Sequence, residues 1–322
     1  MYKYNPDRQG LSEVKILALE PWRLYPKGEE LNPEFLRSNR SGQLRITHCT
    51  PIASIGSCFA REIKNWLKLN GYSFIETAQG LCAEAGSARY DRVYNTFTLR
   101  QEFERAFGKF EPQEVYWEFE ERGDVRLLDP YRKGVAWENR EEMHRELREH
   151  QKNVRKAFTQ AEVLIITVGQ AEIWYHKNDG YVYPLVPPVQ VFDPAIHGFR
   201  LSSYEENLAN LERTFELFTA HNPTGHIIIT VSPVPLRATF RPVNSLVANM
   251  ASKSILRAAV EAFVTNHPEH ITYFPAYEVV MVAEKEPFKD DNRHVKSEVV
   301  DRIMQLFEDW FVEPKLSISR YS

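Results

Sequence analysis

Short apolar runs that stop at glycine or at a Ser-Pro pair are the strongest pattern in the chain. The first run covers 46–55 and stops at Gly56, and the second covers 162–168 and stops at Gly169. A third run, 226–231, ends at a Ser-Pro pair. Runs of this length with few polar positions are typical of strands that are buried on both faces of a parallel sheet.

Stretches with apolar residues at helical spacing separate these runs. The first one follows Gly56 almost directly, which predicts a strand, a tight turn and a helix. The predicted helices cover 59–69, 140–158, 204–221, 249–267 and 297–311. Buried strands that alternate with amphipathic helices predict an α/β fold with a mostly parallel sheet and helices on both faces.

The same pattern suggests how the chain is divided. Residues 1–45 show little periodicity and are expected to form an irregular lead-in. The main domain is expected to cover 46–311, with a strand-rich insertion near 108–139, and 312–322 to form a C-terminal tail.

Composition and charge narrow the class of protein. The chain has 322 residues, of which 43% are hydrophobic and 26% charged, as in an ordinary globular protein. Its 40 Lys and Arg residues stand against 44 Asp and Glu residues, giving a net charge of -4. Nucleic-acid binding usually needs a basic excess, so no nucleic-acid partner is expected.

Cysteine content and hydropathy suggest a cytoplasmic protein. The three cysteines, Cys49, Cys58 and Cys82, form no Cys-x-x-Cys pair, so neither a disulfide framework nor a structural zinc site is expected. No stretch reaches the roughly 18 apolar residues that span a bilayer, so no membrane association is expected.

A hydroxyl and a thiol follow the first predicted strand. In open parallel sheets, ligands bind outside the carboxyl ends of the strands. Ser57 and Cys58 stand there at the start of a helix, where backbone amides stabilise an anion and lower the pKa of a thiol. Either one is a candidate nucleophile. The structural alternative is that Ser57 caps the helix and Cys58 is a small buried apolar residue.

A candidate base lies just before the last predicted helix. Asp291 and His294 are three residues apart in a loop, a spacing that lets the carboxylate hold one imidazole nitrogen while the other faces a nucleophile. A lone pair of this kind is also common as a structural contact.

Several segments together resemble a known family. Residues 54–60 contain Gly-Ser-Cys-Phe-Ala, the signature of the GSCFA-domain family, which itself resembles the SGNH (GDSL-type) hydrolases. Further segments that look like the family, in family order, are 93–100, 166–169, 231–234, 251–257 and 273–278. The resemblance implies a flavodoxin-like three-layer α/β/α sandwich, an ester hydrolase ancestry, and no metal or organic cofactor.

The resemblance also implies roles for individual residues. Asp291 and His294 match the late Asp-x-x-His block that supplies the orienting carboxylate and the base in SGNH hydrolases. When the hydrolase pattern Gly-Asp-Ser is anchored on Gly56, Cys58 takes the place of the nucleophilic serine, whereas residue type favours Ser57. We favour Cys58, whose thiolate would suit acyl transfer as well as hydrolysis.

The third block of the hydrolases, Gly-x-Asn-Asp, is altered in this chain. It reads Gly169-Gln170-Ala-Glu, so no Asn stands in register to donate to an oxyanion. Losing one such donor costs about 10²- to 10³-fold in rate. Backbone amides around Gly56 and Cys58, the Gln170 side chain, or Asn95 would have to replace it, and Asn95 is the preferred candidate.

Positive side chains are predicted near the same edge of the sheet. Lys253 could reach an anionic group of a substrate, and Arg237 and Arg241 could add positive charge to the rim. The alternative for all three is an ordinary solvent-exposed surface. Glu172 is either a second acid or the partner of a nearby Lys or Arg.

These inferences favour an SGNH-like ester hydrolase or acyltransferase that acts on an O-acyl group of a glycan or other polar metabolite. The nucleophile would be Cys58 or Ser57. The alternative is a catalytically degenerate SGNH fold that binds a glycan or a partner protein, motivated by the altered third block. The sequence does not indicate an oligomeric state.

Overall fold

Four parallel strands form the central sheet of the computed structural model. Their order is β1 (Ile52–Gly56), β5 (Val163–Val168), β9 (His226–Val231) and β10 (Ile271–Tyr273). β1 and β5 are buried along their whole length, as the apolar runs predict. The structure describes residues 23–38, 44–77, 86–88, 93–114, 116–121, 123–132, 134–184 and 186–313.

A short segment outside β1 completes a flavodoxin-like strand order. Phe74 forms a parallel bridge with Ile52, and the Ile52 amide donates to the Ser73 carbonyl over 2.9 Å. When the strands are numbered by their order along the chain, they lie across the sheet in the order 2-1-3-4-5, which is the flavodoxin-like order. The predicted fold class is therefore confirmed.

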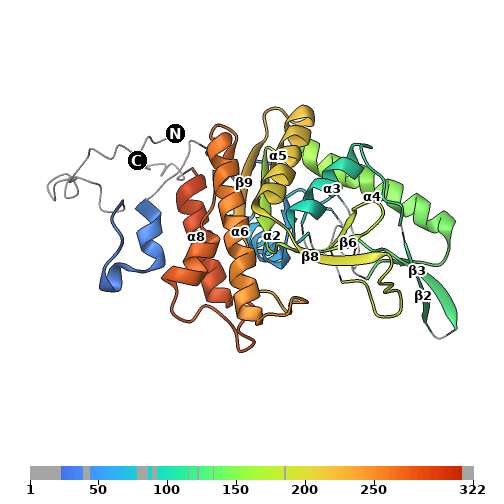
Figure 1. Cartoon of the computed structure of the whole chain (residues 1–322). Helices are drawn as coiled ribbons and strands as arrows, with labels where there is room; N and C mark the ends of the chain where they lie inside the picture. The colour runs from blue at the N-terminus through green and yellow to red at the C-terminus, as the bar shows by residue number, and fades with distance from the viewer. Residues whose placement is uncertain are drawn as a thin grey trace, which may run out of the picture.

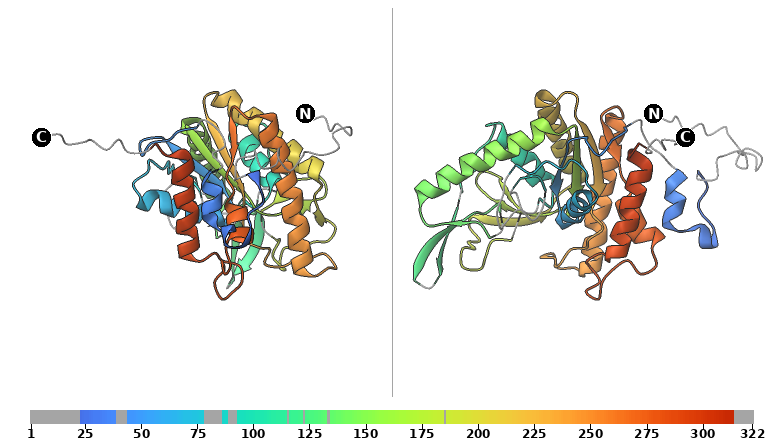
Figure 2. Two further views of the ribbon diagram at one scale, coloured as in Figure 1. Left: turned by 90° about the vertical axis from the view of Figure 1, so that its left-hand side faces the viewer. Right: turned by 180° about the vertical axis from the view of Figure 1, so that it is seen from behind.

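Helices cover both faces of this sheet (Figures 1 and 2). On one face, α2 (Cys58–Leu69) and α8 (Ser297–Phe311) contribute the apolar side chains Phe59, Ile63 and Phe307 to one core. The left-hand view of Figure 2 shows α8 and α6 on opposite sides of the strands. The other face carries α3 (Thr96–Ala106), α4 (Arg140–Gln160), α5 (Tyr204–His221) and α6 (Ser245–Asn266).

Polar side chains set where most of these helices begin. An Asn or Ser oxygen accepts from a backbone amide in the first turn, which satisfies one of the donors that a helix start leaves open. The capping residues are Ser57 for α2, Asn95 for α3, Asn139 for α4, Ser203 for α5 and Asn244 for α6. Because Asn244 is the cap, α6 begins at Ser245, four residues before the predicted start.

Two small antiparallel sheets lie beside the central one. The stretch predicted to be a strand-rich insertion near 108–139 holds β2 (Trp117–Glu121), β3 (Asp124–Leu128) and β4 (Ala136–Trp137). Figure 1 shows the β2–β3 hairpin at the end of the molecule opposite α8. The other small sheet consists of β6 (Glu172–His176), β7 (Val182–Tyr183) and β8 (His197–Leu201).

Interactions of buried charged side chains hold the insertion against α3 and α4. Arg132 Nε donates to Asp129 Oδ2 over 2.6 Å, and its two terminal nitrogens donate to Glu146 of α4 over 2.9 and 2.6 Å. The Arg105 guanidinium of α3 lies 4.8 Å from the centre of the Tyr131 ring. Removing one partner from such a buried pair leaves an uncompensated charge, so this cluster fixes the insertion in place.

The region before β1 differs from its predicted form. The predicted strand over 46–55 begins only at Ile52, because 47–50 form a turn and Ile46 pairs with Val312 instead. The lead-in contains the short helices η2 (Gly28–Glu30) and η3 (Pro33–Ser38), and Trp310 Nε1 of α8 donates to the Leu36 carbonyl over 3.0 Å.

The remaining described elements are α7 (Ala276–Glu278) and η4 (Val279–Ala283), which lead towards α8. Cys82, residues 1–22 of the predicted lead-in and residues 314–322 of the predicted tail lie outside the described residues. Among the residues that the structure describes, no helix is both long and apolar enough to cross a membrane.

Candidate functional site

Three strand ends meet at one edge of the central sheet. A Cβ placed on Gly169, after β5, would lie 3.4 Å from the Ser57 Cβ after β1 and 3.6 Å from the Ser232 Cβ after β9. A cavity of about 270 Å³ opens there, with Ser57, Cys58, Gly169, Gln170 and Ser232 in its lining. The segments that the sequence singled out are therefore brought together.

Gly56 allows β1 to turn at this edge. Its φ is 150°, a conformation that side chains rarely adopt, and a Cβ there would overlap the carbonyl and hydroxyl oxygens of Thr167 on β5. The next amide, of Ser57, donates to Thr167 Oγ1 over 2.8 Å. Only glycine gives the close approach of β1 and β5 that this turn requires.

Ser57 serves as the helix cap. Its hydroxyl lies 2.9 Å from Thr167 Oγ1 and accepts from the Phe59 amide over 3.3 Å, and the residue is almost fully buried. Both contacts engage the hydroxyl oxygen within the protein. Ser57 therefore has the geometry of an N-cap, as the structural alternative predicts.

Cys58 is the first residue of α2 and lines the cavity while partly exposed. It is therefore not the small buried apolar residue of the structural alternative. Helix starts carry partial positive charge, which favours a thiolate.

Lys253 lies beneath the cavity. Its Nζ donates to the carbonyls of Gly169 and Ser232, both over 2.6 Å, and of Val234 over 2.9 Å. Burial lowers the pKa of Lys253 to about 7, while the charge of Cys58 acts to raise this pKa. Both predicted roles of Lys253 are corrected here. The residue is 1% exposed, so it is not part of the solvent-exposed surface, and its three donors hold the loops after β5 and β9 instead of a substrate group.

The altered third block is also fixed by backbone contacts. The amides of Gly169 and Gln170 donate to the Tyr94 carbonyl over 2.7 and 3.1 Å, so neither points to a substrate. The Ala171 amide donates to the buried Ser252 hydroxyl over 2.6 Å. Among these residues, the Gln170 side chain is the group that can still donate into the cavity.

Asn95 is buried at the start of α3. Its Oδ1 accepts from the Thr98 amide over 2.9 Å, which is the geometry of a helix cap. Its neighbour Tyr94 lines the cavity, whereas Asn95 is not among the lining residues.

Asp291 and His294 form a hydrogen-bonded pair on an exposed loop. His294 Nδ1 contacts Asp291 Oδ2, and the amides of Arg293 and His294 donate to Asp291 Oδ1 over 3.0 and 2.9 Å. These hydrogen bonds, above all those from His294, hold the pKa of Asp291 well below its usual range. Asn292 makes the turn between the partners with a φ of 54°.

Arg293, not His294, is the residue of this loop that lines the cavity. Its Nη2 donates to the Pro235 carbonyl over 3.2 Å, which joins the loop before α8 to the loop after β9. Arg293 lies inside the Asp-x-x-His block but is not one of its two motif residues, so the motif alone did not indicate it. The structure therefore places the predicted base next to the cavity lining but not in it.

The sequence singled out three further residues, Glu172, Arg237 and Arg241. Glu172 accepts from the Thr239 hydroxyl over 2.8 and 2.9 Å and lies 3.9 Å from Arg241. Of the two predicted roles of Glu172, pairing with a nearby cation therefore matches its geometry. Arg237 is exposed and lines the cavity mouth.

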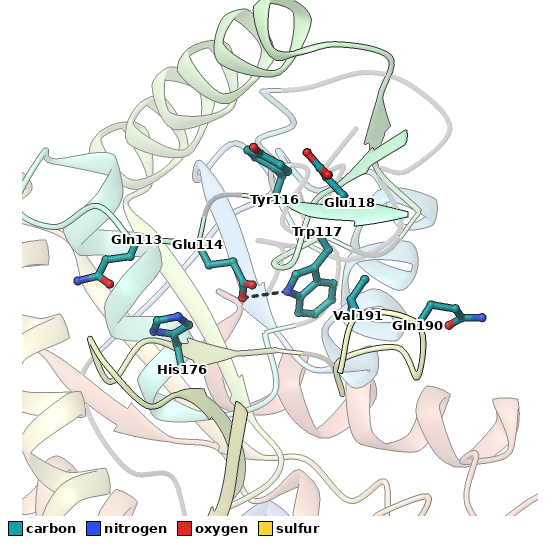
Figure 3. Close-up of a pocket in the computed structure, with 8 residues that line it drawn as sticks. All are labelled: Gln113, Glu114, Tyr116, Trp117, Glu118, His176, Gln190 and Val191. Atoms are coloured by element: carbon teal, nitrogen blue, oxygen red, sulfur yellow. Dashed lines mark hydrogen bonds between the residues drawn. The ribbon is translucent and has the colours of Figure 1, made fainter. Parts of the chain in front are cut away.

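A larger hollow, of about 460 Å³, lies at the insertion (Figure 3). It is lined by two carboxylates, Glu114 and Glu118, and Glu114 accepts from Trp117 Nε1 over 2.9 Å and contacts the Tyr183 hydroxyl. The described residues of its lining include no serine or cysteine and no residue from the ends of the central strands. The smaller cavity is therefore the candidate site. No group of His, Cys, Asp or Glu side chains in the described part of the chain could hold a metal ion.

Comparisons with known proteins give one family and a distant structural similarity. The model of the GSCFA family matches residues 51–307. No curated protein matches the chain. A solved structure that is similar in part is an acetyl xylan esterase from the rumen bacterium Butyrivibrio proteoclasticus, at 12% identity and a TM-score of 0.33. The similarity covers 84% of this chain but only 64% of that one.

Proposed function

The chain belongs to the GSCFA family, and we propose that it is an SGNH-like ester hydrolase or acyltransferase with Cys58 as its nucleophile. The observation that carries the proposal is the position of Cys58 at the start of α2 and in the lining of the cavity, where three strand ends meet. Ser57 is the weaker candidate because its hydroxyl is held by Thr167 and by the Phe59 amide.

The proposed reaction proceeds through a thioester. The Cys58 sulfur attacks the acyl carbon of an ester while its proton passes to Nε2 of His294. The ester C–O bond then breaks, and the leaving alkoxide takes that proton. Water or an acceptor hydroxyl attacks the thioester next, giving an acid or a new ester and restoring the thiol. Asp291 keeps His294 oriented through Nδ1.

The proposed oxyanion donors differ from those of the hydrolase pattern. We assign the role to the Gln170 side chain together with the positive end of α2, since the Gly169 and Gln170 amides are engaged with Tyr94. Asn95 is the second choice because it caps α3 and does not line the cavity.

A binding module without catalysis is the second candidate. The position of Arg293 favours it, because this side chain lines the cavity where a catalytic base would be expected, while His294 remains exposed. In this case the cavity would hold a glycan or a segment of a partner protein.

Turnover of p-nitrophenyl acetate separates the two candidates. An enzyme with Cys58 as nucleophile should lose at least about 100-fold in rate in Cys58→Ala. The matched control is Cys49→Ala, which removes an exposed cysteine away from the cavity lining and should leave the rate unchanged. Equal rates in wild type and Cys58→Ala would contradict the proposal.

A further inference from the structure

One part of the cavity wall is apolar. Its side chains come from the loop after β7 and from the loop between β9 and α6. The apolar lining residues are Pro184, Val186, Val234, Pro235, Leu236, Ala238 and Phe240. We propose that this wall binds a hydrocarbon acyl chain of about four to eight carbons, so that the substrates are esters of medium-chain acids rather than acetates.

The size of the cavity gives an upper limit to the chain length. A volume of about 270 Å³ equals that of about nine water molecules at roughly 30 Å³ each, and a methylene group is of similar size. An acetyl group would leave most of this space unfilled. Unfilled apolar space carries no binding energy, whereas each buried methylene strengthens binding about fourfold, which corresponds to roughly 0.8 kcal/mol.

The wall is held in place by aromatic contacts. Phe240 is 53% exposed, yet its ring centre lies 4.9 Å from that of Trp174 on β6 and 5.5 Å from that of Phe199 on β8. The Leu236 amide donates to Asn249 Oδ1 of α6 over 3.1 Å. The loop after β9 is thus anchored on both sides, and the wall exists before a ligand binds.

Exposed apolar side chains follow the wall along the chain, at the start of α6. Leu246 is 78% exposed, and Met250 lies one turn further along the same helix face. Val243 and Val247 are exposed as well.

The charges at the cavity suit the carboxylate that hydrolysis would release. Among the described residues that line the cavity, Arg237 and Arg293 are the charged ones, and none is Asp or Glu. A fatty-acid product would therefore have an apolar wall for its tail and guanidinium groups for its head. This makes octanoate a direct probe of the site, independent of turnover.

The inference rests on the proposed function, because the acyl carbon must reach Cys58. The first test compares kcat/KM for p-nitrophenyl octanoate and p-nitrophenyl acetate. We expect wild type to favour octanoate at least tenfold, and Phe240→Ala and Val186→Ser each to reduce this ratio at least fivefold. The control Leu69→Ser removes an 86% exposed leucine at the other end of α2 and should leave the ratio unchanged.

Calorimetric binding of octanoate and acetate to Cys58→Ala is the second test. Octanoate binding that weakens in Cys58→Ala/Phe240→Ala supports the acyl-chain site even if wild type shows no turnover, and in that case only the proposed function fails. Acetate turnover with no octanoate preference and no octanoate binding overturns the inference, while the proposed function stands.

Discussion

Lys253 donates a hydrogen bond to the Gly169 carbonyl over 2.6 Å and thereby ties α6 to the loop after β5. The same ammonium holds the carbonyls of Ser232 and Val234. Lys253, which the sequence suggests as a substrate contact, thus supports the loops beneath the cavity. Its replacement should therefore change the free energy of unfolding.

Lys253→Met should change how stability depends on pH. The pKa of Lys253 is about 7 in the folded protein and near its ordinary value of 10.5 in the unfolded chain. Between these values the unfolded chain binds more protons, so the free energy of unfolding of wild type rises with pH, by at most about 1.4 kcal/mol per pH unit. Lys253→Met should lack this rise. Urea denaturation of both proteins between pH 7 and 10 measures this pH dependence. The same rise of the free energy of unfolding with pH in wild type and Lys253→Met would contradict the account.

Gly56→Ala should destabilise the protein by about 2–4 kcal/mol. The added methyl group would overlap Thr167, and the φ of 150° strains any side chain. Gly71→Ala is the matched control because Gly71 also has a positive φ but open space around its Cβ position, so it should cost only about 1 kcal/mol. Urea denaturation of both variants checks the difference, and equal costs would show that β1 and β5 tolerate the methyl group.

Asn95→Ala should cost about 1 kcal/mol of stability through the loss of a helix cap. Asn139→Ala removes the equivalent cap of α4 and should cost a similar amount. If Asn95 acts only as a cap, both variants should keep their turnover rates at temperatures where they are folded. A loss of about 100-fold or more in Asn95→Ala alone would instead identify Asn95 as the oxyanion donor.

Asp291→Ala should slow acylation at least about tenfold at neutral pH, because the carboxylate no longer holds His294 in orientation through Nδ1. Thermal stability should change little because both side chains are exposed. Stopped-flow acylation at neutral pH gives the measurement. An unchanged acylation rate would show that the pair takes no part in the mechanism.

Much of the fold could be predicted because its signals are local. The apolar runs define β5 and β9 to within one residue, and the predicted α5 and α8 have the observed limits. β10 is only three residues long, too short for a run to stand out. Ile46 has β-compatible character but pairs with Val312, a contact set by where the segments before β1 and after α8 meet rather than by local sequence.

The candidate site could be predicted only in part. The strand-end rule predicts that the loops of Cys58, Gly169 and Ser232 meet, and the structure brings them together. The place of Arg293 could not be predicted, because it depends on how the loop before α8 folds against Pro235. The three carbonyls around Lys253 likewise come from loops whose paths only the tertiary structure sets.

Peptide mapping of a trapped acyl adduct tests the central claim most directly. The protein is mixed with p-nitrophenyl octanoate, quenched in acid and digested for mass spectrometry, alongside Cys58→Ala and Cys49→Ala. The account predicts an octanoyl group on Cys58 in wild type and in Cys49→Ala, and none in Cys58→Ala. An adduct on Ser57, or one that forms equally in Cys58→Ala, would contradict it.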